Sequence, residues 1–265
     1  LRHALARREF VPFYQPIVRL SDNSVAGFEA LIRWFKPGVG RIPPGDFISV
    51  AEESGLIVKM GHWIIRTACE DINHLEAAQR QANPDRPPLF VTVNLSIRQF
   101  SDPILFDTIN STLAKEGLAA NRVKLEVTES MVMSNMDAAL ALLKQCKSLG
   151  AKLAVDDFGT GYSSLAYLHK FPMDTLKLDR SFIQDMASNE ASMKIVRAVA
   201  HLAGELGLAP VCEGVEQAEQ VESCRKVGIT YAQGFYYSPA LPVDEAAVYL
   251  QAPVAVAAAR KMFLK

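Results

Sequence analysis

The sequence predicts an α/β fold: a TIM-like (β/α)8 barrel in which one strand runs antiparallel to its neighbours. Short β-rich segments alternate with longer helical ones along nearly all 265 residues, which is typical of βαβ units and a parallel sheet. Eight such strands favour closure into a barrel covered by helices. Only Leu20–Ser24 separates the first two strands, which is too short for a parallel crossover, so these strands should form an antiparallel hairpin.

The expected strands are short, apolar runs bounded by turn residues. In chain order they are Val11–Val18, Val25–Trp34, Leu89–Leu95, Arg122–Thr128, Lys152–Val155, Thr175–Asp179, Ala209–Glu213 and Tyr231–Gln233. Helical patterns lie between most of them, at Met60–Ala78, Pro103–Glu116, Asp137–Leu149, Ser164–His169, Glu190–Leu206 and Glu216–Lys226, and a last helix is expected at Val243–Leu250. The polar, proline-rich stretches Pro37–Pro44 and Arg80–Pro88 are expected to be surface loops.

Composition and charge exclude several classes of partner. The formal net charge is −1, with no polybasic block, so neither a DNA or RNA polymer nor a membrane surface is an expected partner of this domain. No apolar stretch approaches the roughly 20 residues that span a bilayer. Four scattered cysteines without a CxxC pair indicate reduced thiols and a cytoplasmic location. We expect a single domain, residues 1–265, cut from a longer protein whose membrane attachment is left open.

Acidic and amide side chains recur where the predicted strands end or near those ends. They are Glu29, Asn94, Glu126, Asp156, Asp157, Asp179, Glu213 and Gln233, joined by Lys177. In a parallel barrel these ends converge on the rim where barrel active sites lie. Oxygen ligands without Cys or His suit Mg²⁺ or Mn²⁺. Five of these carboxylates, those of Glu29, Glu126, Asp156, Asp157 and Glu213, would be neutralised by two divalent ions together with Lys177, which predicts a site able to accept a phosphodiester.

Each of these residues also has a purely structural interpretation. Asp156 and Asp157 could cap the following helix, Lys177 could be a salt-bridge partner at the rim, and Asn94 could cap the next turn. Their recurrence at one predicted rim favours a shared metal site. Asp157-Phe158-Gly159 matches a kinase motif, but the glycine-rich strand-turn and His-Arg-Asp motif of kinases do not precede it. None of the five histidines is assigned to chemistry.

Several motifs together resemble the EAL phosphodiesterases, over about Phe10 to Pro242. They are Tyr14-Gln15-Pro16-Ile17-Val18, Gly27-Phe28-Glu29-Ala30-Leu31-Ile32-Arg33-Trp34, Val93-Asn94-Leu95-Ser96, Leu125-Glu126-Val127-Thr128-Glu129, Asp156-Asp157-Phe158-Gly159-Thr160-Gly161-Tyr162-Ser163-Ser164, Lys177-Leu178-Asp179, Glu213-Gly214-Val215-Glu216 and Gln233-Gly234-Phe235. The resemblance implies a domain of a multidomain bacterial signalling protein, preceded by a sensory or GGDEF domain. The chain departs from the usual pattern of this family in the loop Val39–Pro44, where contacts to the ligand could differ.

The resemblance also implies roles for particular residues. Two divalent ions, Mg²⁺ or Mn²⁺, would be held by Glu29, Asn94, Glu126, Asp156, Asp157 and Glu213, with Asp156 serving both. Lys177 would act with Glu29 and Glu213 in catalysis by approaching the attacking water. The substrate side of the rim would include Gln15, Leu31, Arg33, Asp179 and Gln233. Glu129 and Glu216 would support the loop from Asp156 to Ser164, with Glu216 as its anchor.

The implied reaction is attack of a metal-activated hydroxide on cyclic di-GMP to give linear pGpG, and it remains open whether Lys177 is a general base. The alternatives are a receptor module that binds cyclic di-GMP without turnover, a scaffold with a vestigial site, or hydrolysis of another phosphodiester. The resemblance also suggests a homodimer through the face near the loop Asp156–Ser164 and its following helix.

Overall fold

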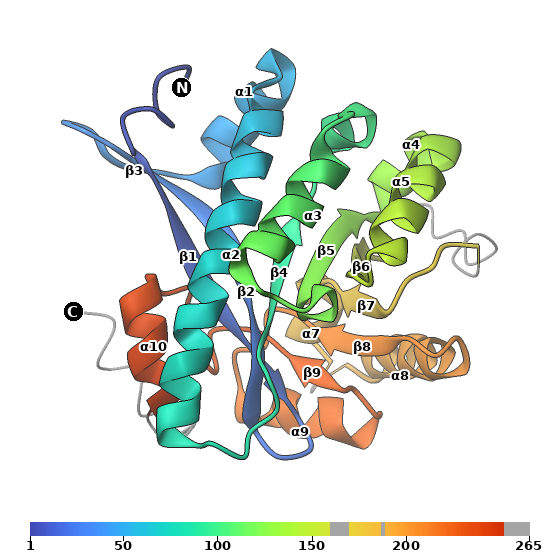
Figure 1. Ribbon diagram of the computed structural model, residues 1–265. Helices are drawn as coiled ribbons and strands as arrows, with labels where there is room; N and C mark the ends of the chain where they lie inside the picture. The colour runs from blue at the N-terminus through green and yellow to red at the C-terminus, as the bar shows by residue number, and fades with distance from the viewer. Residues whose placement is uncertain (160–169, 187–188, 252–265) are drawn as a thin grey trace.

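The computed structural model describes residues 1–159, 170–186 and 189–251, and its strands form a closed barrel (Figure 1). Eight strands form the ring, and one further strand, β3 (Gly40–Ile42), is paired to its outside through β2. The ring strands are β1 (Phe10–Arg19), β2 (Ser24–Lys36), β4 (Phe90–Asn94), β5 (Val123–Thr128), β6 (Lys152–Phe158), β7 (Thr175–Leu178), β8 (Ala209–Cys212) and β9 (Tyr231–Ala232). The predicted fold class is confirmed.

One strand of the ring is reversed. β1 pairs antiparallel with both β2 and β9, whereas β2 and β4 to β9 pair parallel in the order of the chain. The hairpin turn explains the reversal, because Asp22 accepts a hydrogen bond from the Ser24 amide at 2.9 Å and Asn23 adopts a left-handed φ of 56°. Such short turns of Asp and Asn join antiparallel strands.

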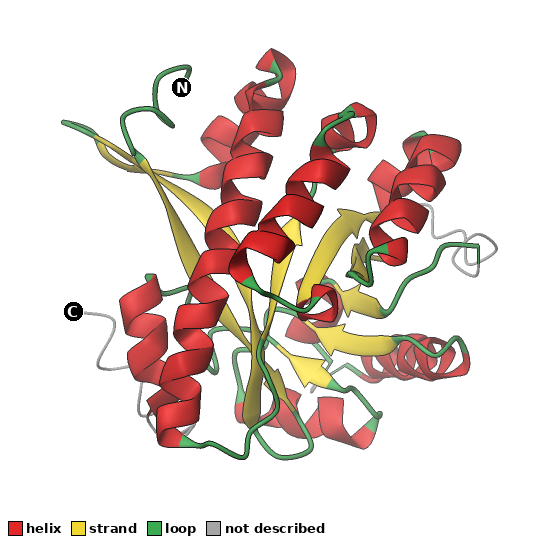
Figure 2. Cartoon of the chain, viewed as in Figure 1, coloured by secondary structure: helices red, strands yellow, loops and turns green. Residues whose placement is uncertain are grey.

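The helices lie outside the ring of strands (Figure 2). They are α1 (Pro44–Ser54), α2 (Leu56–Ala82), α3 (Leu105–Glu116), α4 (Glu129–Ser134), α5 (Met136–Ser148), α7 (Arg180–Gln184), α8 (Glu190–Glu205), α9 (Ala218–Lys226) and α10 (Val243–Gln251), with 3₁₀ turns η1 (Ile97–Ser101) and η2 (Ala120–Arg122). α10 packs beside α2 and against the reversed strand β1 (Figure 1). No helix in the described part of the chain is long and apolar enough to cross a membrane.

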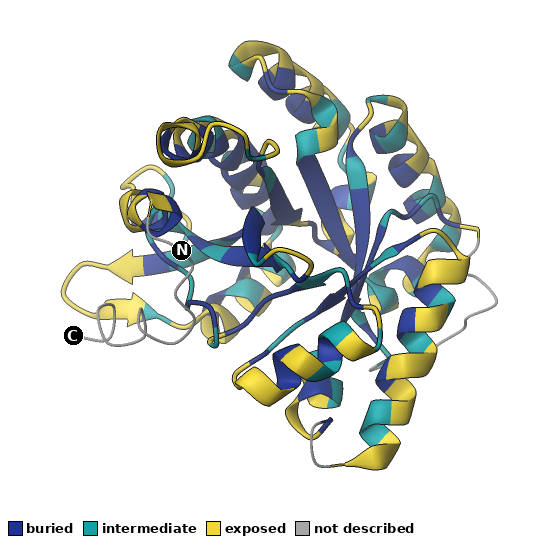
Figure 3. Ribbon diagram, turned by 90° about the horizontal axis from the view of Figure 1, so that it is seen from below, coloured by how far each residue is buried: buried dark blue, intermediate teal, exposed yellow. Residues whose placement is uncertain are grey.

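Burial follows the helical repeat. On α2 the side chains of Ile65, Ala68, Ile72 and Leu75 are fully buried, at the spacing of three and four residues that keeps them on one face of a helix. The outer faces of the helices are exposed, while the strands between them are buried (Figure 3). The helices therefore pack their apolar faces on the strands, and polar side chains inside the barrel need their own partners.

The structure corrects several expected elements. The stretch Pro37–Pro44 is not simply a loop, because it contains β3 and leads into α1. The helix expected at Met60 begins at Leu56, directly after Gly55, whose left-handed φ of 74° separates α1 from α2. The helix expected at Glu216 begins at Ala218, and α4 and α7 were not expected. The expected helix Ser164–His169 lies outside the described residues. All four cysteines are buried and free.

Candidate active site

The predicted rim residues meet at the carboxyl ends of the parallel strands. Strand register aligns them in neighbouring pairs: Asn94 lies beside Glu126, and Asp156 lies beside Thr128. β2 continues past its last pairing with β4 at Ala30, so Glu29 sits near the end of the part of β2 that belongs to the parallel barrel. Side chains of alternate residues point to the same face of a strand, which directs these groups into the barrel.

Lys177 lies at the centre of the carboxylates. Its ammonium nitrogen is 2.6 Å from Glu213 Oε1, 2.8 Å from Glu126 Oε2 and 3.2 Å from Asp156 Oδ2. A fourth carboxylate oxygen, Glu29 Oε2, is 3.8 Å away. The lysine side chain is only 2% exposed. Four carboxylates therefore face one buried cation, which leaves a formal charge of −3 if all are ionised.

Amide side chains orient Glu29. Asn94 donates to Glu29 Oε1 at 2.7 Å, and Gln233 donates to Glu29 Oε2 at 2.5 Å. Gln233 also donates to Gln15 Oε1 at 3.0 Å, and Gln15 in turn donates to the Ser238 carbonyl at 3.3 Å. Both oxygens of Glu29 are thereby held in place, while the carbonyl oxygens of Asn94 and Gln233 remain as acceptors on the same rim.

The strand carrying Asp156 and Asp157 is irregular at these two residues. The pairing of β6 with β7 shifts register between Val155 and Phe158, and Asp157 has a left-handed φ of 53°. Its amide donates to Asp156 Oδ1 at 2.9 Å. A non-glycine residue in this conformation costs about 1–2 kcal/mol. Bulges of this kind re-aim side chains next to active sites, and here two consecutive carboxylates are presented at one rim.

Burial and mutual repulsion change the pKa values of this cluster. Burial raises the pKa of Glu126 to about 7, against the opposing attraction of Lys177 and with further repulsion from Glu29. Burial likewise raises the pKa of Glu213 well above its usual value. The pKa of Asp157 is raised by burial and by the neighbouring Asp156. Burial opposes protonation of Lys177, but the surrounding carboxylates raise its pKa well above 10.5.

The carboxylate and amide oxygens at this rim are chemically suited to bind hard divalent cations. Glu126 Oε1 is buried and has no hydrogen-bond partner among the residues that the structure describes, and an unpaired buried carboxylate oxygen is costly unless a cation meets it. Carboxylate and amide oxygens are the ligands that Mg²⁺ and Mn²⁺ prefer. Among the described residues, no three acidic, histidine or cysteine side chains are already gathered as a metal cage. The carboxylates converge on the Lys177 ammonium instead.

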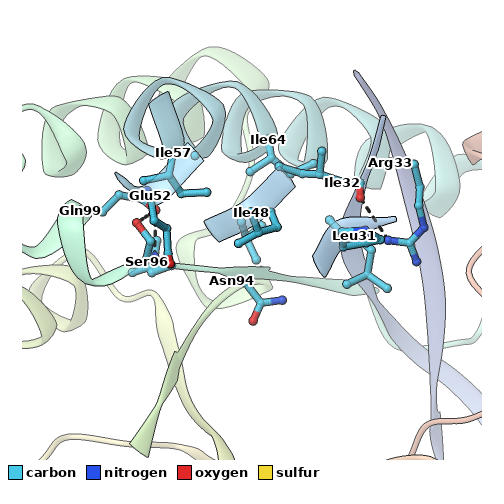
Figure 4. Close-up of a pocket in the computed structure, with 15 residues that line it drawn as sticks. Leu31, Ile32, Arg33, Ile48, Glu52, Ile57, Ile64, Asn94, Ser96 and Gln99 are labelled. Carbon is cyan, nitrogen blue, oxygen red and sulfur yellow. Dashed lines mark hydrogen bonds between the residues drawn. The ribbon is translucent and has the colours of Figure 1, made fainter. Parts of the chain in front are cut away.

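A pocket of about 470 Å³ opens beside this cluster, between β2, α1, α2 and the end of β4. Apolar side chains including Leu31, Ile48 and Ile57 line it. Its polar groups lie at two ends: Glu52, Ser96 and Gln99 gather at one, and Arg33 lies at the other (Figure 4). Asn94 belongs both to the pocket wall and to the carboxylate cluster. A molecule in the pocket would therefore touch the cluster.

The remaining predicted residues occupy several places around this site. Asp179 follows β7 and caps α7 by accepting from the Ser181 amide at 3.0 Å. Burial acts to raise the pKa of Asp179, but the hydrogen bonds from Ser181 and the charge of Arg180 lower it below its usual value. Glu129 accepts from the Gly159 amide at 3.2 Å, at the start of the expected loop. Glu216 is exposed, and most of the loop that it was expected to anchor lies outside the described residues.

Sequence reasoning missed the far end of the pocket. Glu52 lies on α1 and Gln99 on η1, two elements that were not expected. Gln99 accepts from the Ser96 amide at 2.9 Å and closes a capping box. The spacing Ser-x-x-Gln at residues 96–99 is the signature of such a box, so this turn was detectable from the sequence, whereas the position of Glu52 was not.

The fold and the rim together define a class of protein, a barrel with one reversed strand and a carboxylate–lysine centre at its carboxyl end. A family model described as "EAL domain" matches residues 1–240. The chain belongs to the EAL domain family.

Relatives and solved structures agree with this assignment. The "Cyclic di-GMP phosphodiesterase NbdA" of Pseudomonas aeruginosa is 39% identical over 95% of this chain and 31% of its own length. The structure "PaMucR Phosphodiesterase, c-di-GMP complex" has a TM-score of 0.83 at 38% identity, covering 92% of this chain and 96% of that one. The structure of the EAL enzyme Bd1971 bound to cAMP and cyclic di-GMP has a TM-score of 0.89 at 33% identity, covering 94% of this chain and 66% of that one. The chain spans about a third of the length of the curated relatives it matches.

Proposed function

We propose that this domain hydrolyses one phosphodiester bond of cyclic di-GMP to give linear pGpG, with the help of two divalent cations. The observation that carries this proposal is the convergence of four carboxylates on Lys177, with one buried Glu126 oxygen left without a partner in the described part of the chain. A phosphodiester brought to this rim would be repelled unless cations compensated the carboxylates. The names of the relatives and the cyclic di-GMP complexes of similar structures support the choice of substrate.

Six residues would hold the cations. They are Glu29, Asn94, Glu126, Asp156, Asp157 and Glu213. When bound, Mg²⁺ or Mn²⁺ would lower the pKa of water and neutralise charge at the phosphate. Attack of a water oxygen on phosphorus would break the bond to the 3′ oxygen, leaving a 3′-hydroxyl and a 5′-phosphate. Lys177 would position that water and donate to the developing charge, because its ammonium already lies among the carboxylates.

The pocket would receive one nucleotide. Its volume of about 470 Å³ lies within the range of small-molecule sites, and its apolar walls suit a base. Glu52 would accept hydrogen bonds from the N–H groups of guanine, and Leu31 would pack against the nucleotide. At the other end of the pocket, Arg33 would donate to a phosphate oxygen through its fork of N–H groups.

The setting of the domain is also a proposal. Because several of the matched relatives are about three times as long as this chain, we infer that residues 1–265 form one domain of a longer signalling protein. The homodimer expected near the loop Asp156–Ser164 stays a prediction, since residues 160–169 lie outside the described part of the chain.

The test is chromatography of cyclic di-GMP incubated with this domain in Mg²⁺, in Mn²⁺ and in chelator. We expect pGpG with either metal, none in chelator, and none with Glu29→Ala, which removes the group that Asn94 and Gln233 orient. Glu53→Ala, on the exposed side of α1, is the matched control and should retain turnover. Intact substrate in every sample would contradict the proposal. A binding titration would then distinguish a receptor from a protein that does not bind this nucleotide.

A further inference from the structure

A second positive group lies beside Arg33 at the mouth of the pocket. β2 runs beyond the barrel and pairs antiparallel with β3, with Phe35 opposite Arg41. Arg33 and Phe35 are two residues apart on β2 and share one face of the strand. Arg41 is therefore the diagonal neighbour of Arg33, at a separation that long side chains bridge.

The two guanidinium groups repel each other and have no acidic partner in the described part of the chain. Within the described residues, neither Arg33 nor Arg41 forms an ion pair with a carboxylate. Arg33 donates to the neighbouring Ile32 carbonyl at 3.1 Å and lies over the Phe13 ring at 5.8 Å. Burial and the charge of Arg41 lower the pKa of Arg33. An anion between the two groups would relieve this repulsion and accept their N–H donors.

The arginine pair and the carboxylate cluster lie along the same strand. Glu29, Leu31 and Arg33 share one face of β2, and a strand rises about 3.4 Å per residue, so Arg33 is about 13 Å along the strand from Glu29. The Arg33 side chain lies beside Leu31 in Figure 4, at the opposite end of the pocket from Glu52. A ligand that reaches from the carboxylate cluster along β2 would thus meet the positively charged arginine pair within one molecular length.

We propose that Arg41 acts with Arg33 to bind the phosphodiester of cyclic di-GMP that is not being cleaved. This inference rests on the proposed function, because it takes the other phosphodiester to lie at the carboxylate cluster. A cyclic dinucleotide carries two phosphodiesters, and the domain offers two places that suit them: the cation-binding rim and the arginine pair. Arg41 is a substrate-binding residue that lies in the sequence segment Val39–Pro44, where the chain departs from the usual EAL pattern.

The test is the kinetics of Arg41→Leu with cyclic di-GMP and with bis(p-nitrophenyl) phosphate, which has a single phosphodiester. We expect KM for cyclic di-GMP to rise about tenfold with kcat unchanged, as for loss of one charge-assisted hydrogen-bond donor from an exposed strand. Hydrolysis of the single phosphodiester should be unaffected. Arg41→Lys should recover part of the loss, and Arg66→Leu, on the exposed face of α2, should resemble the parent protein.

Three results would overturn the inference while leaving the proposed function intact. One is an unchanged KM for Arg41→Leu in a domain that makes pGpG. The second is an equal loss with both substrates, which would place Arg41 at the cleavage site. The third is an effect that vanishes with cyclic di-AMP, which would mean that Arg41 contacts guanine and not phosphate. If the parent binds cyclic di-GMP without turnover, the same tenfold change is expected in Kd. A parent that does not bind would refute both proposals.

Discussion

Replacement of Lys177 by methionine tests the electrostatic account of the site most directly. Methionine keeps the approximate length of the side chain but removes the ammonium that contacts Glu213, Glu126 and Asp156 at 2.6–3.2 Å. The carboxylates would then face one another inside the barrel without a cation. We expect turnover to fall by orders of magnitude, because the variant loses the group that would position the attacking water.

The expected loss of stability follows from burial. The side chains of Lys177 and Glu126 are 2% and 1% exposed, and breaking a buried ion pair by removing one partner costs about 3–5 kcal/mol. For a chain of this size that corresponds to a melting temperature lower by roughly 6–20 °C. Because the pKa values of Glu126 and Glu213 are already raised by burial, the variant would retain protons that the unfolded chain releases. Its deficit should therefore grow as the pH rises from about 6 to about 8.

The assay is thermal unfolding of Lys177→Met and the parent in chelator, at several pH values, and again with Mg²⁺ or Mn²⁺. Added metal should stabilise the variant more than the parent, because divalent cations replace the lost charge. Lys152→Met is the matched control: its side chain is 43% exposed and pairs with Asp174, so it should lose less than about 1 kcal/mol. Equal stability of Lys177→Met and the parent in chelator, at pH 8, would refute the buried-charge argument.

Two further variants test the pocket and the barrel wall. Gly61→Ala would place a methyl group against the Gln99 amide in the pocket. We expect KM for cyclic di-GMP to rise severalfold and kcat to stay unchanged, while the free energy of unfolding changes by less than about 2 kcal/mol because alanine favours the helix. An unchanged KM would exclude the pocket as the nucleotide site. Asp174→Asn would weaken the bonds from Lys147 and Lys152 at 2.5 and 2.8 Å. These bonds lower the pKa of Asp174 although burial acts to raise it, so the variant should lose about 1–3 kcal/mol at pH 7. In urea unfolding the deficit should shrink only as the pH falls from about 4, the pKa of Asp in the unfolded chain, toward the lowered pKa of the folded protein. A deficit that does not shrink below about pH 4 would contradict this account.

The barrel could be predicted because its main signals are local. The short turn at Asp22 and Asn23 determines the reversed strand, and the alternation of strands and helices determines the rest. β3 and α1 were missed because α1 buries only Phe47 and Ala51, so its pattern is weakly amphipathic. Pro44 and Gly45 suggest a loop, although Pro at the first position of a helix is a regular start signal.

The site could be predicted only as a set of strand ends. Parallel register brings Asn94 beside Glu126, and this follows from the fold class alone. The distances do not, because convergence of four carboxylates on Lys177 depends on the width of the barrel and on the bulge at Asp156 and Asp157. The polar end of the pocket was missed for a different reason, since Glu52 comes from a helix whose existence was not recognised.

The near-neutral net charge of −1 conceals a strong separation of charge. Carboxylates concentrate around Lys177 at the rim, while Arg33 and Arg41 have no acidic partners in the described part of the chain at the mouth of the pocket. A substrate with two phosphodiesters would be repelled at the first place and attracted at the second. Under the proposed function, divalent cations would reverse the repulsion at the first, so binding in the reactive orientation would require the metal, whereas the arginine pair would act without it. Catalysis would then belong to the barrel rim, and substrate capture to the hairpin of β2 and β3 that extends from it.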